Sequence, residues 1–379
     1  MTNKERILNS IMGKPVDRPA VNFYEIGGFS VNPFDDNKYN VYNSLDWQPL
    51  LELAETKTDL MRFANAKMIP KYPDLRNNIL KIESYEEADS CYNTITYNTK
   101  KGILTEITRR DIDTDTVWHV KHLLENTDDV NAYLSIPNEF FEMKYDISHV
   151  DKLEQELGDR GVVMFDSGDP LCVSAGLFSM ADYTVFALTE PNLFHELIEK
   201  SSIHIYDNIN QTTRKKKGHI WRICGPEYAT APYLPPRLFK EYVCKYDKKI
   251  IDIIHKSGGF VRLHCHGNIK DVLHMMIDMD IDGLDPIEPP NQGDVELSFV
   301  RREYGKYICL FGNIEASNIE YMPNEDFEKL VRKAVQDGIC GEGRGFVLQP
   351  TASPYGRHIS KTVLKNYEIM IEIVNEMRI

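Results

Sequence analysis

The stretch 260–268, FVRLHCHGN, decides the fold of this 379-residue chain. Its first half is typical of a buried β-strand, and Gly267–Asn268 follow it as a turn signal. A helix is predicted before the strand over 236–256, because Pro235–Pro236 give a start signal and Gly258–Gly259 give a stop signal. A helix that leads into a buried strand and then into another helix is the repeating unit of parallel α/β proteins.

The same alternation of short apolar runs and amphipathic segments continues from Pro19 to the end of the chain. A further helix is predicted over 325–336. Eight buried strands that alternate with helices favour the α/β class and a closed (β/α)8 barrel, the TIM barrel, over an open sheet. The expected strands are 20–24, 59–63, 161–165, 218–223, 260–264, 283–286, 307–311 and 345–348.

One segment interrupts this alternation. Residues 91–123 are rich in Thr, Tyr, Val and Ile, with turn signals at 100–102 and 111–115. They predict a β-hairpin inserted after the second strand, within a β-rich insertion over about residues 75–125 of one barrel domain, 1–379. Two roles stay open for this insertion: a cap on the barrel mouth, or a decoration of the surface.

The charge of the chain limits its partners. A formal charge of −14 and a pI of about 5.3 argue against nucleic acid or an anionic membrane, since both favour a positive surface. The basic run 214–217 is better explained as the end of a helix, where cations complement the helix dipole.

Targeting signals and cysteine usage indicate the compartment. No segment approaches the roughly 20 apolar residues that a membrane-spanning helix needs, and the first residues have no apolar signal core behind them. The seven cysteines are odd in number and scattered, which favours free thiols over a disulfide framework. We therefore expect a cytoplasmic protein.

Polar residues gather where most of the predicted strands end. In a TIM barrel the carboxyl ends of the strands carry the catalytic groups, so these residues are the candidates for chemistry. About half of them are expected to be ordinary cap or turn residues. The candidates are Glu25, Asp166, Asp169, Glu227, Asp285, Glu288, Asn313 and Glu315.

The most specific pair is His264 and His266. Side chains two residues apart on a strand point to the same side, so both imidazoles face one way and Cys265 faces the other. Two imidazoles can bind zinc, with Glu227 from the adjacent strand end as the third ligand. The alternatives are a hydrogen-bonded or acid-base histidine, and an anion site at the amides of 267–268.

These segments resemble the uroporphyrinogen decarboxylase superfamily. The resemblance runs from about Arg6 to Val374 and is strongest after Gly218. It implies a (β/α)8 barrel. The segments that carry it are 234–239, 258–268, 283–285 and 312–315.

Within that superfamily, the first strand end argues against porphyrin decarboxylation. The decarboxylases have an arginine-rich motif there, whereas the stretch 18–28 keeps Arg18–Pro19 but has Glu25 and no arginine cluster. A carboxylate would repel a substrate with many carboxylates. The stretch 264–267 and the Glu-Pro-Pro run at 288–290 instead resemble corrinoid-dependent methyltransferases.

The coenzyme M members of that branch bind zinc through His-x-Cys and a late cysteine. Here His266 stands in place of that cysteine, and the segment 348–354 has none. A site of nitrogen and oxygen ligands suits an oxygen-containing methyl donor better than a thiol.

The resemblance thus implies O-demethylation. Zinc on His264, His266 and Glu227 would act as a Lewis acid on the ether oxygen of a small methylated substrate, an aromatic methyl ether, while cob(I)alamin takes the methyl group. The chain has no Asp-x-His-x-x-Gly motif, so the cobalamin would belong to a separate corrinoid protein. The residues expected to act in catalysis are Asp166, Asp285, Glu288 and Asn313. Those expected to bind the substrate are Tyr24, Glu25, Asp169 and Tyr228.

Two other functions stay open on the sequence. The first is a metal-free lyase related to uroporphyrinogen decarboxylase, with His264 as general acid. The second is a non-catalytic module whose barrel mouth only docks a corrinoid protein.

Overall fold

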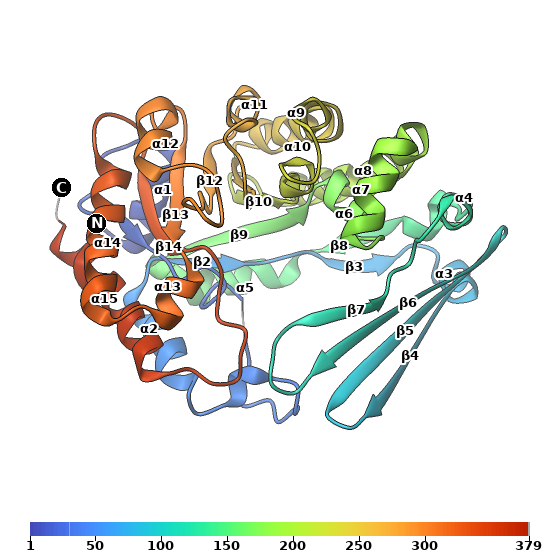
Figure 1. The fold of residues 1–379 in the computed structure, drawn as a ribbon, viewed down its shortest axis with the longest axis horizontal. Helices are drawn as coiled ribbons and strands as arrows, with labels where there is room; N and C mark the ends of the chain where they lie inside the picture. The colour runs from blue at the N-terminus through green and yellow to red at the C-terminus, as the bar shows by residue number, and fades with distance from the viewer. Residues whose placement is uncertain (30, 378–379) are drawn as a thin grey trace.

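Eight parallel strands form the centre of the structure, a computed structural model that describes residues 1–29 and 31–377 (Figure 1). All eight predicted strands are present, which confirms the (β/α)8 fold. In order around the sheet they are β1 (Ala20–Val21), β14 (Phe346–Pro350), β13 (Cys309–Ile314), β12 (Gly283–Asp285), β11 (Phe260–His264), β10 (Ile220–Cys224), β9 (Gly161–Gly168) and β2 (Leu60–Phe63).

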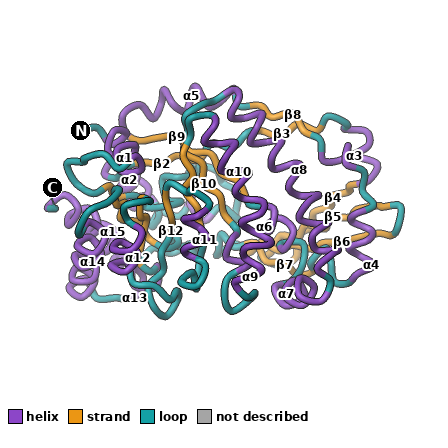
Figure 2. The backbone as a smooth tube through the Cα atoms, turned by 90° about the horizontal axis from the view of Figure 1, so that it is seen from above, coloured by secondary structure: helices purple, strands orange, loops and turns teal. Residues whose placement is uncertain are grey.

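Helices lie around the outside of these strands (Figure 2). The predicted helix 236–256 consists of α9 (Pro236–Phe239), a π-helical turn (Lys240–Cys244) and α10 (Lys245–Lys256). The basic run closes the last turn of α8 (Pro191–Lys215), as predicted. The other helices are α1 (Asn3–Met12), α2 (Gln48–Lys57), α5 (Ser148–Leu157), α6 (Pro170–Ala175), α7 (Met180–Thr189), α11 (Leu273–Asp278), α12 (Leu297–Tyr304), α13 (Ala316–Tyr321), α14 (Asn324–Ile339) and α15 (Lys361–Glu376). None of the helices that the structure describes is long and apolar enough to cross a membrane.

The inside of the barrel changes from apolar to charged along its axis. Alternate residues of each strand point inward, and those nearest the amino ends form an apolar cluster that includes Met61, Met164 and Ile220. Toward the carboxyl ends the inward positions are taken by Arg222 and Arg262, both buried. Charged side chains at this depth must be paired, so the barrel's own packing directs polar groups to its mouth.

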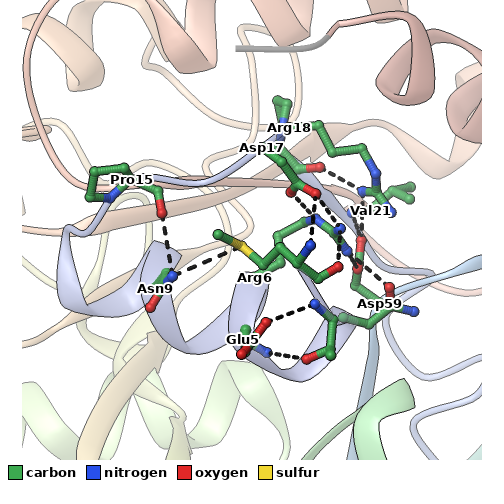
Figure 3. Close-up of polar contacts among 12 residues, drawn as sticks. Glu5, Arg6, Asn9, Pro15, Asp17, Arg18, Val21 and Asp59 are labelled. Atoms are coloured by element: carbon green, nitrogen blue, oxygen red, sulfur yellow. Dashed lines mark hydrogen bonds and ion pairs between the residues drawn. The ribbon is translucent and has the colours of Figure 1, made fainter.

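The two ends of the sheet meet at a buried ion-pair cluster (Figure 3). Asp59 is fully buried, and its carboxylate accepts hydrogen bonds from Arg6 (2.5 Å), Arg18 (2.9 Å) and the Val21 amide (2.8 Å). The Asp59 amide also donates to the Val21 carbonyl at 2.7 Å. Asp59 therefore joins β1 to the segment that leads into β2 and closes the barrel.

The insertion is larger than the predicted hairpin. It is a four-stranded antiparallel sheet of β4 (Leu80–Glu87), β5 (Ser90–Thr99), β6 (Gly102–Asp111) and β7 (Val117–Lys121). The prediction missed β4 because that strand is mostly exposed and has no apolar pattern. Between β2 and this sheet lie β3 (Lys67–Pro70) and α3 (Pro73–Ile79); β8 (Met143–Asp146), which pairs with β3, and α4 (Thr127–Leu134) follow it.

The inserted sheet contacts the loops on the carboxyl side of the barrel. In the turn between β6 and β7, the Asp115 amide donates to the Tyr355 carbonyl at 2.8 Å, and the Asp113 carbonyl accepts from the Arg357 amide at 2.9 Å. Tyr355 and Arg357 belong to the loop after β14. The sheet therefore borders the barrel mouth.

Replacing Asp59 by asparagine should destabilise the chain by roughly 3–5 kcal/mol, because the buried Arg6 and the half-buried Arg18 both lose the charge of this fully buried carboxylate. The control is Asp17→Asn. Asp17 also pairs with Arg6 but its side chain is 45% exposed, so its loss should cost less than about 1 kcal/mol. Denaturation by guanidinium chloride measures the free energy of unfolding of both variants. An equal decrease in the two would contradict this role of Asp59.

Candidate active site

A buried carboxylate organises the barrel mouth. Asp285, at the end of β12, is fully buried and accepts hydrogen bonds from Arg262 (2.5 Å), His264 Nδ1 (3.0 Å) and Gln349 (3.2 Å). Burial alone would raise the pKa of this carboxyl, but the positive charges of Arg262 and His264 outweigh it and hold the pKa far below its usual range. Asp285 is therefore a permanent anion that orients His264.

A second series of polar contacts, from Asp166 through Arg222 and Tyr24, reaches the other nitrogen of His264. Arg222 forms a two-point ion pair with Asp166 (2.7 and 3.1 Å) and donates to the Tyr24 hydroxyl at 2.5 Å. The Tyr24 hydroxyl lies 3.4 Å from His264 Nε2. Tyr24 adopts a φ of 59°, and its amide donates to Asn22 Oδ1 at 2.8 Å. Both nitrogens of His264 are thus engaged.

His266 lies beside His264 but faces a different environment. The two ring centroids are 4.5 Å apart and the ring planes are nearly perpendicular, at 87°. His266 Nδ1 lies 2.8 Å from Glu288, whose other oxygen accepts from the Gly267 amide at 2.6 Å. Cys265 points the opposite way and is buried. The alternation along the strand end therefore brings both imidazoles to one side.

The Glu288 carboxylate controls the charge of His266. Burial lowers the pKa of the His266 imidazole, but the hydrogen bond and the negative charge of Glu288 act more strongly together, and the pKa lies above its ordinary value. The same contact lowers the pKa of Glu288 against its own burial. Each partner therefore favours the charged form of the other.

His266 and Glu288 lie in the wall of an open cavity of about 410 Å³. Two more predicted site residues, Glu227 and Tyr228, also line it. They are held by the 3-10 turn Pro226–Ala229 after β10. The remaining lining residues are Met180, Thr230, Ala231, Pro232, Tyr233, Gly267, Asn268 and Gln292.

The other predicted site residues lie outside this cavity lining. Glu25 lies in the loop after β1, and burial raises the pKa of its carboxyl. Asn313 is the last but one residue of β13, where it pairs with Gln349 in the strand register. Asp169 is fully buried and caps α6, accepting from the Cys172 amide at 2.5 Å. That last position is a structural one, as the Asp-Pro pair at a helix start allows.

One further residue of the site, Arg222, was not among the predicted ones, and another, Glu315, was a candidate without an assigned role. Arg222 could have been found, because a charged residue inside the apolar strand Ile220–Cys224 must face a buried partner. Glu315 was noted only as a strand-end residue. Burial raises the pKa of its carboxyl to about 7, and the charge of Glu288 acts in the same direction.

The predicted zinc ligands are only partly assembled. Each imidazole has a carboxylate on Nδ1. This leaves Nε2 of His266 for a metal, whereas Nε2 of His264 faces the Tyr24 hydroxyl at 3.4 Å. Glu227 Oε2 is buried without a hydrogen-bond partner among the described side chains. Within residues 1–29 and 31–377, however, no group of three His, Cys, Asp or Glu side chains could hold a metal ion. The residues therefore fit two zinc ligands and do not complete a third.

The comparisons with known proteins identify the family. Residues 111–377, well over half of the chain, match the family model of uroporphyrinogen decarboxylase (URO-D). The chain belongs to the uroporphyrinogen decarboxylase family. The resemblance read from 258–268 is thus confirmed at the level of the family, whereas membership of its corrinoid-dependent branch stays a prediction.

The solved structures agree with this family at the level of the fold. A methyltransferase from Methanosarcina mazei superposes on the chain with a TM-score of 0.61 and 14% sequence identity, over 99% of each chain. At that identity the likeness concerns the fold alone. No curated protein matches the sequence of this uroporphyrinogen decarboxylase family member.

Replacing Glu288 by glutamine should lower the pKa of His266, because the variant removes the negative charge next to the ring. NMR titration of the histidine ring protons measures this pKa in both proteins. His255 is an internal control: its Nε2 lies 2.8 Å from Asp282, away from the cavity, and its raised pKa should not change. An unchanged His266 titration would refute the pairing.

Proposed function

We propose that this protein transfers a methyl group from a small methylated substrate, an aromatic methyl ether, to the cob(I)alamin of a separate corrinoid protein. Three observations support the proposal: the family, the fold shared with a methyltransferase, and a cavity whose wall carries His266 in contact with the Glu288 carboxylate. The last of these carries most of the argument, because it supplies the chemistry that ether cleavage needs.

Breaking an aryl ether requires activation of its oxygen. Cobalt(I) attacks the methyl carbon, the carbon–oxygen bond breaks, and the aryl oxygen leaves with the bonding electrons. His266, held by Glu288, would give this oxygen its proton from Nε2, so that a phenol leaves in place of a phenolate. The cobalt ends as methylcobalt(III), which balances the two electrons that it donates.

The surrounding residues keep this proton donor in place. Asp285 and Tyr24 hold His264, and the His264 ring packs edge to face on His266. Glu227 and Tyr228, which also line the cavity, would position the substrate. Glu315, whose pKa of about 7 allows either protonation state, would return a proton to the His266–Glu288 pair between turnovers.

The proposal includes a zinc ion at this site, and elemental analysis of the purified protein tests for it. Bound by His264, His266 and Glu227, it would polarise the same ether oxygen as a Lewis acid. Among the described residues, the third ligand is not assembled with the two imidazoles.

The alternative lyase function relies on His264 as general acid. His264 is buried, both of its nitrogens are engaged, and it does not line the cavity. His266 is better placed for proton transfer, so we favour methyl transfer.

Purified protein should transfer methyl groups from a panel of methoxyarenes to cob(I)alamin, followed by the visible spectrum of the cobalt. His266→Ala should lower the rate by roughly 10²–10⁴-fold, the usual contribution of a general acid. The rate should also fall as the pH rises through the raised pKa of His266. The control His274→Ala, on the exposed part of α11, should leave the rate unchanged. Decarboxylation without methyl transfer would contradict the proposal.

His264→Ala should lose zinc and turnover together, as measured by elemental analysis and the same assay. The comparison variant is His255→Ala, since His255 pairs with Asp282 outside the cavity and should retain both. A His264→Ala protein with full zinc content and full activity would refute the proposed metal site.

A further inference from the structure

Two carboxyl groups lie together in the interior behind the cavity. Asp169 follows β9 and caps α6, and Asp247 lies on α10, outside the barrel. Both side chains are completely buried, and they lie within hydrogen-bonding reach of each other. Such a position is costly for even one carboxylate and much more costly for two.

Most of the carboxyl oxygens of this pair lack a hydrogen-bond donor. Asp169 Oδ1 accepts from the Cys172 amide, but Asp169 Oδ2 and both oxygens of Asp247 have no donor among the residues that the structure describes. Two ionised carboxylates cannot bond to one another, whereas a protonated one donates to the other. A proton between the two therefore removes the repulsion and satisfies at least one of these oxygens.

Neither carboxylate forms an ion pair with a cationic side chain among the residues that the structure describes. Burial raises the pKa of both carboxyls well above the usual range, and the mutual repulsion acts in the same direction for Asp169. The titratable groups that face the pair are Cys172 on α6, Tyr183 on α7, Tyr206 on α8, Cys224 on β10, Glu227 and Tyr228 on the 3-10 turn, Cys244 on the π-helical turn, and Cys265 after β11. A single proton is thus the countercharge that these surroundings favour.

Asp169 is packed directly against the turn that carries Glu227. The Asp169 amide donates to the Cys224 carbonyl at 2.8 Å. Gly225, with a φ of 127°, approaches so closely that a β-carbon on it would lie 2.7 Å from Asp169 Oδ1. The position of Asp169 therefore determines the course of the turn 224–229 along the cavity wall.

We propose that Asp169 and Asp247 share a proton and that this protonated pair positions the turn 224–229, and with it Glu227, at the cavity. Asp247 is then a positioning residue that acts through Asp169, although it lies far outside the barrel interior. Loss of the shared proton leaves two buried charges in contact, and the turn and α10 must separate. This inference concerns the cavity wall and does not depend on which reaction the site performs.

The shared proton makes a prediction about stability. A carboxyl whose pKa is raised in the folded state keeps its proton where the unfolded chain has lost it. The stabilisation is therefore complete below about pH 4 and is lost as the pH rises toward the raised pKa. In Asp247→Asn, the asparagine amide has nearly the shape of a protonated aspartic acid and carries no charge. It can donate a hydrogen bond to Asp169 at every pH, because it does not titrate.

The test is the melting temperature of the wild type and Asp247→Asn between about pH 5 and pH 9. The two should be similar at pH 5, and the variant should be the more stable by roughly 2 °C or more at pH 9. Taking the difference between the two proteins cancels the titration of all other groups. A difference that does not change with pH would overturn the proposal, as would a shift of the same size in Asp252→Asn, the exposed control on α10.

Two further measurements keep the test decisive if Asp247→Asn folds poorly. Asp169→Asn, which can still cap α6, should flatten the pH dependence in the same way. Hydrogen exchange in the peptide 224–230 should accelerate at alkaline pH in the wild type relative to either variant, whereas a purely structural role would change exchange equally at all pH values. A bound cation at the pair, detected by elemental analysis of the wild type and absent from Asp247→Asn, would also refute the shared proton.

Discussion

The negative charge of Asp285 in the interior of the barrel is the constraint on which the site depends. An ion at this depth is stable only if it is paired and hydrogen-bonded. Arg262 and His264 from β11 and Gln349 from β14 supply those bonds. Asp285 thereby determines the orientation of His264. His264 in turn limits where His266 can lie, because their rings are in contact.

The same requirement for paired buried charges explains why the barrel interior is apolar near the amino ends of the strands and polar near their carboxyl ends. Arg222 and Arg262 take the place of the upper apolar layer, and each needs a carboxylate, Asp166 or Asp285, above it. Those carboxylates are placed by the alternation of the strands. The arrangement leaves His266 and Glu288 at the edge of the network, where they meet the cavity. The proposed chemistry would therefore take place beside a buried charged network and not within it.

Much of the fold could be predicted because its evidence is local. Each barrel strand is a short apolar run between turn signals, and His264 and His266 lie two residues apart on one strand end, which brought them to the same side. The inserted sheet was underestimated because β4 has charged residues on both faces. Its existence depends on pairing with β5, a long-range contact that the sequence of β4 does not reveal.

The site could be predicted only in part for the same reason. Asp169 was expected to bind substrate, yet its neighbour Pro170 makes it a helix cap, and its buried partner Asp247 comes from a helix far along the chain. Whether Glu227 reaches the two imidazoles depends on the course of a turn held by that pair. Tertiary packing decides whether a strand-end residue lines the cavity or supports its wall, and the local sequence does not show that packing.

The most direct measurement is a crystal structure of the protein with a methoxylated aromatic compound bound. The account predicts that the ring occupies the cavity between Tyr228 and His266, with the ether oxygen within hydrogen-bonding distance of His266 Nε2 and the methyl group directed to solvent, where a cobalt atom can approach it. A substrate bound with its methoxy group away from His266, or enclosed so that no corrinoid could reach the methyl carbon, would contradict the account.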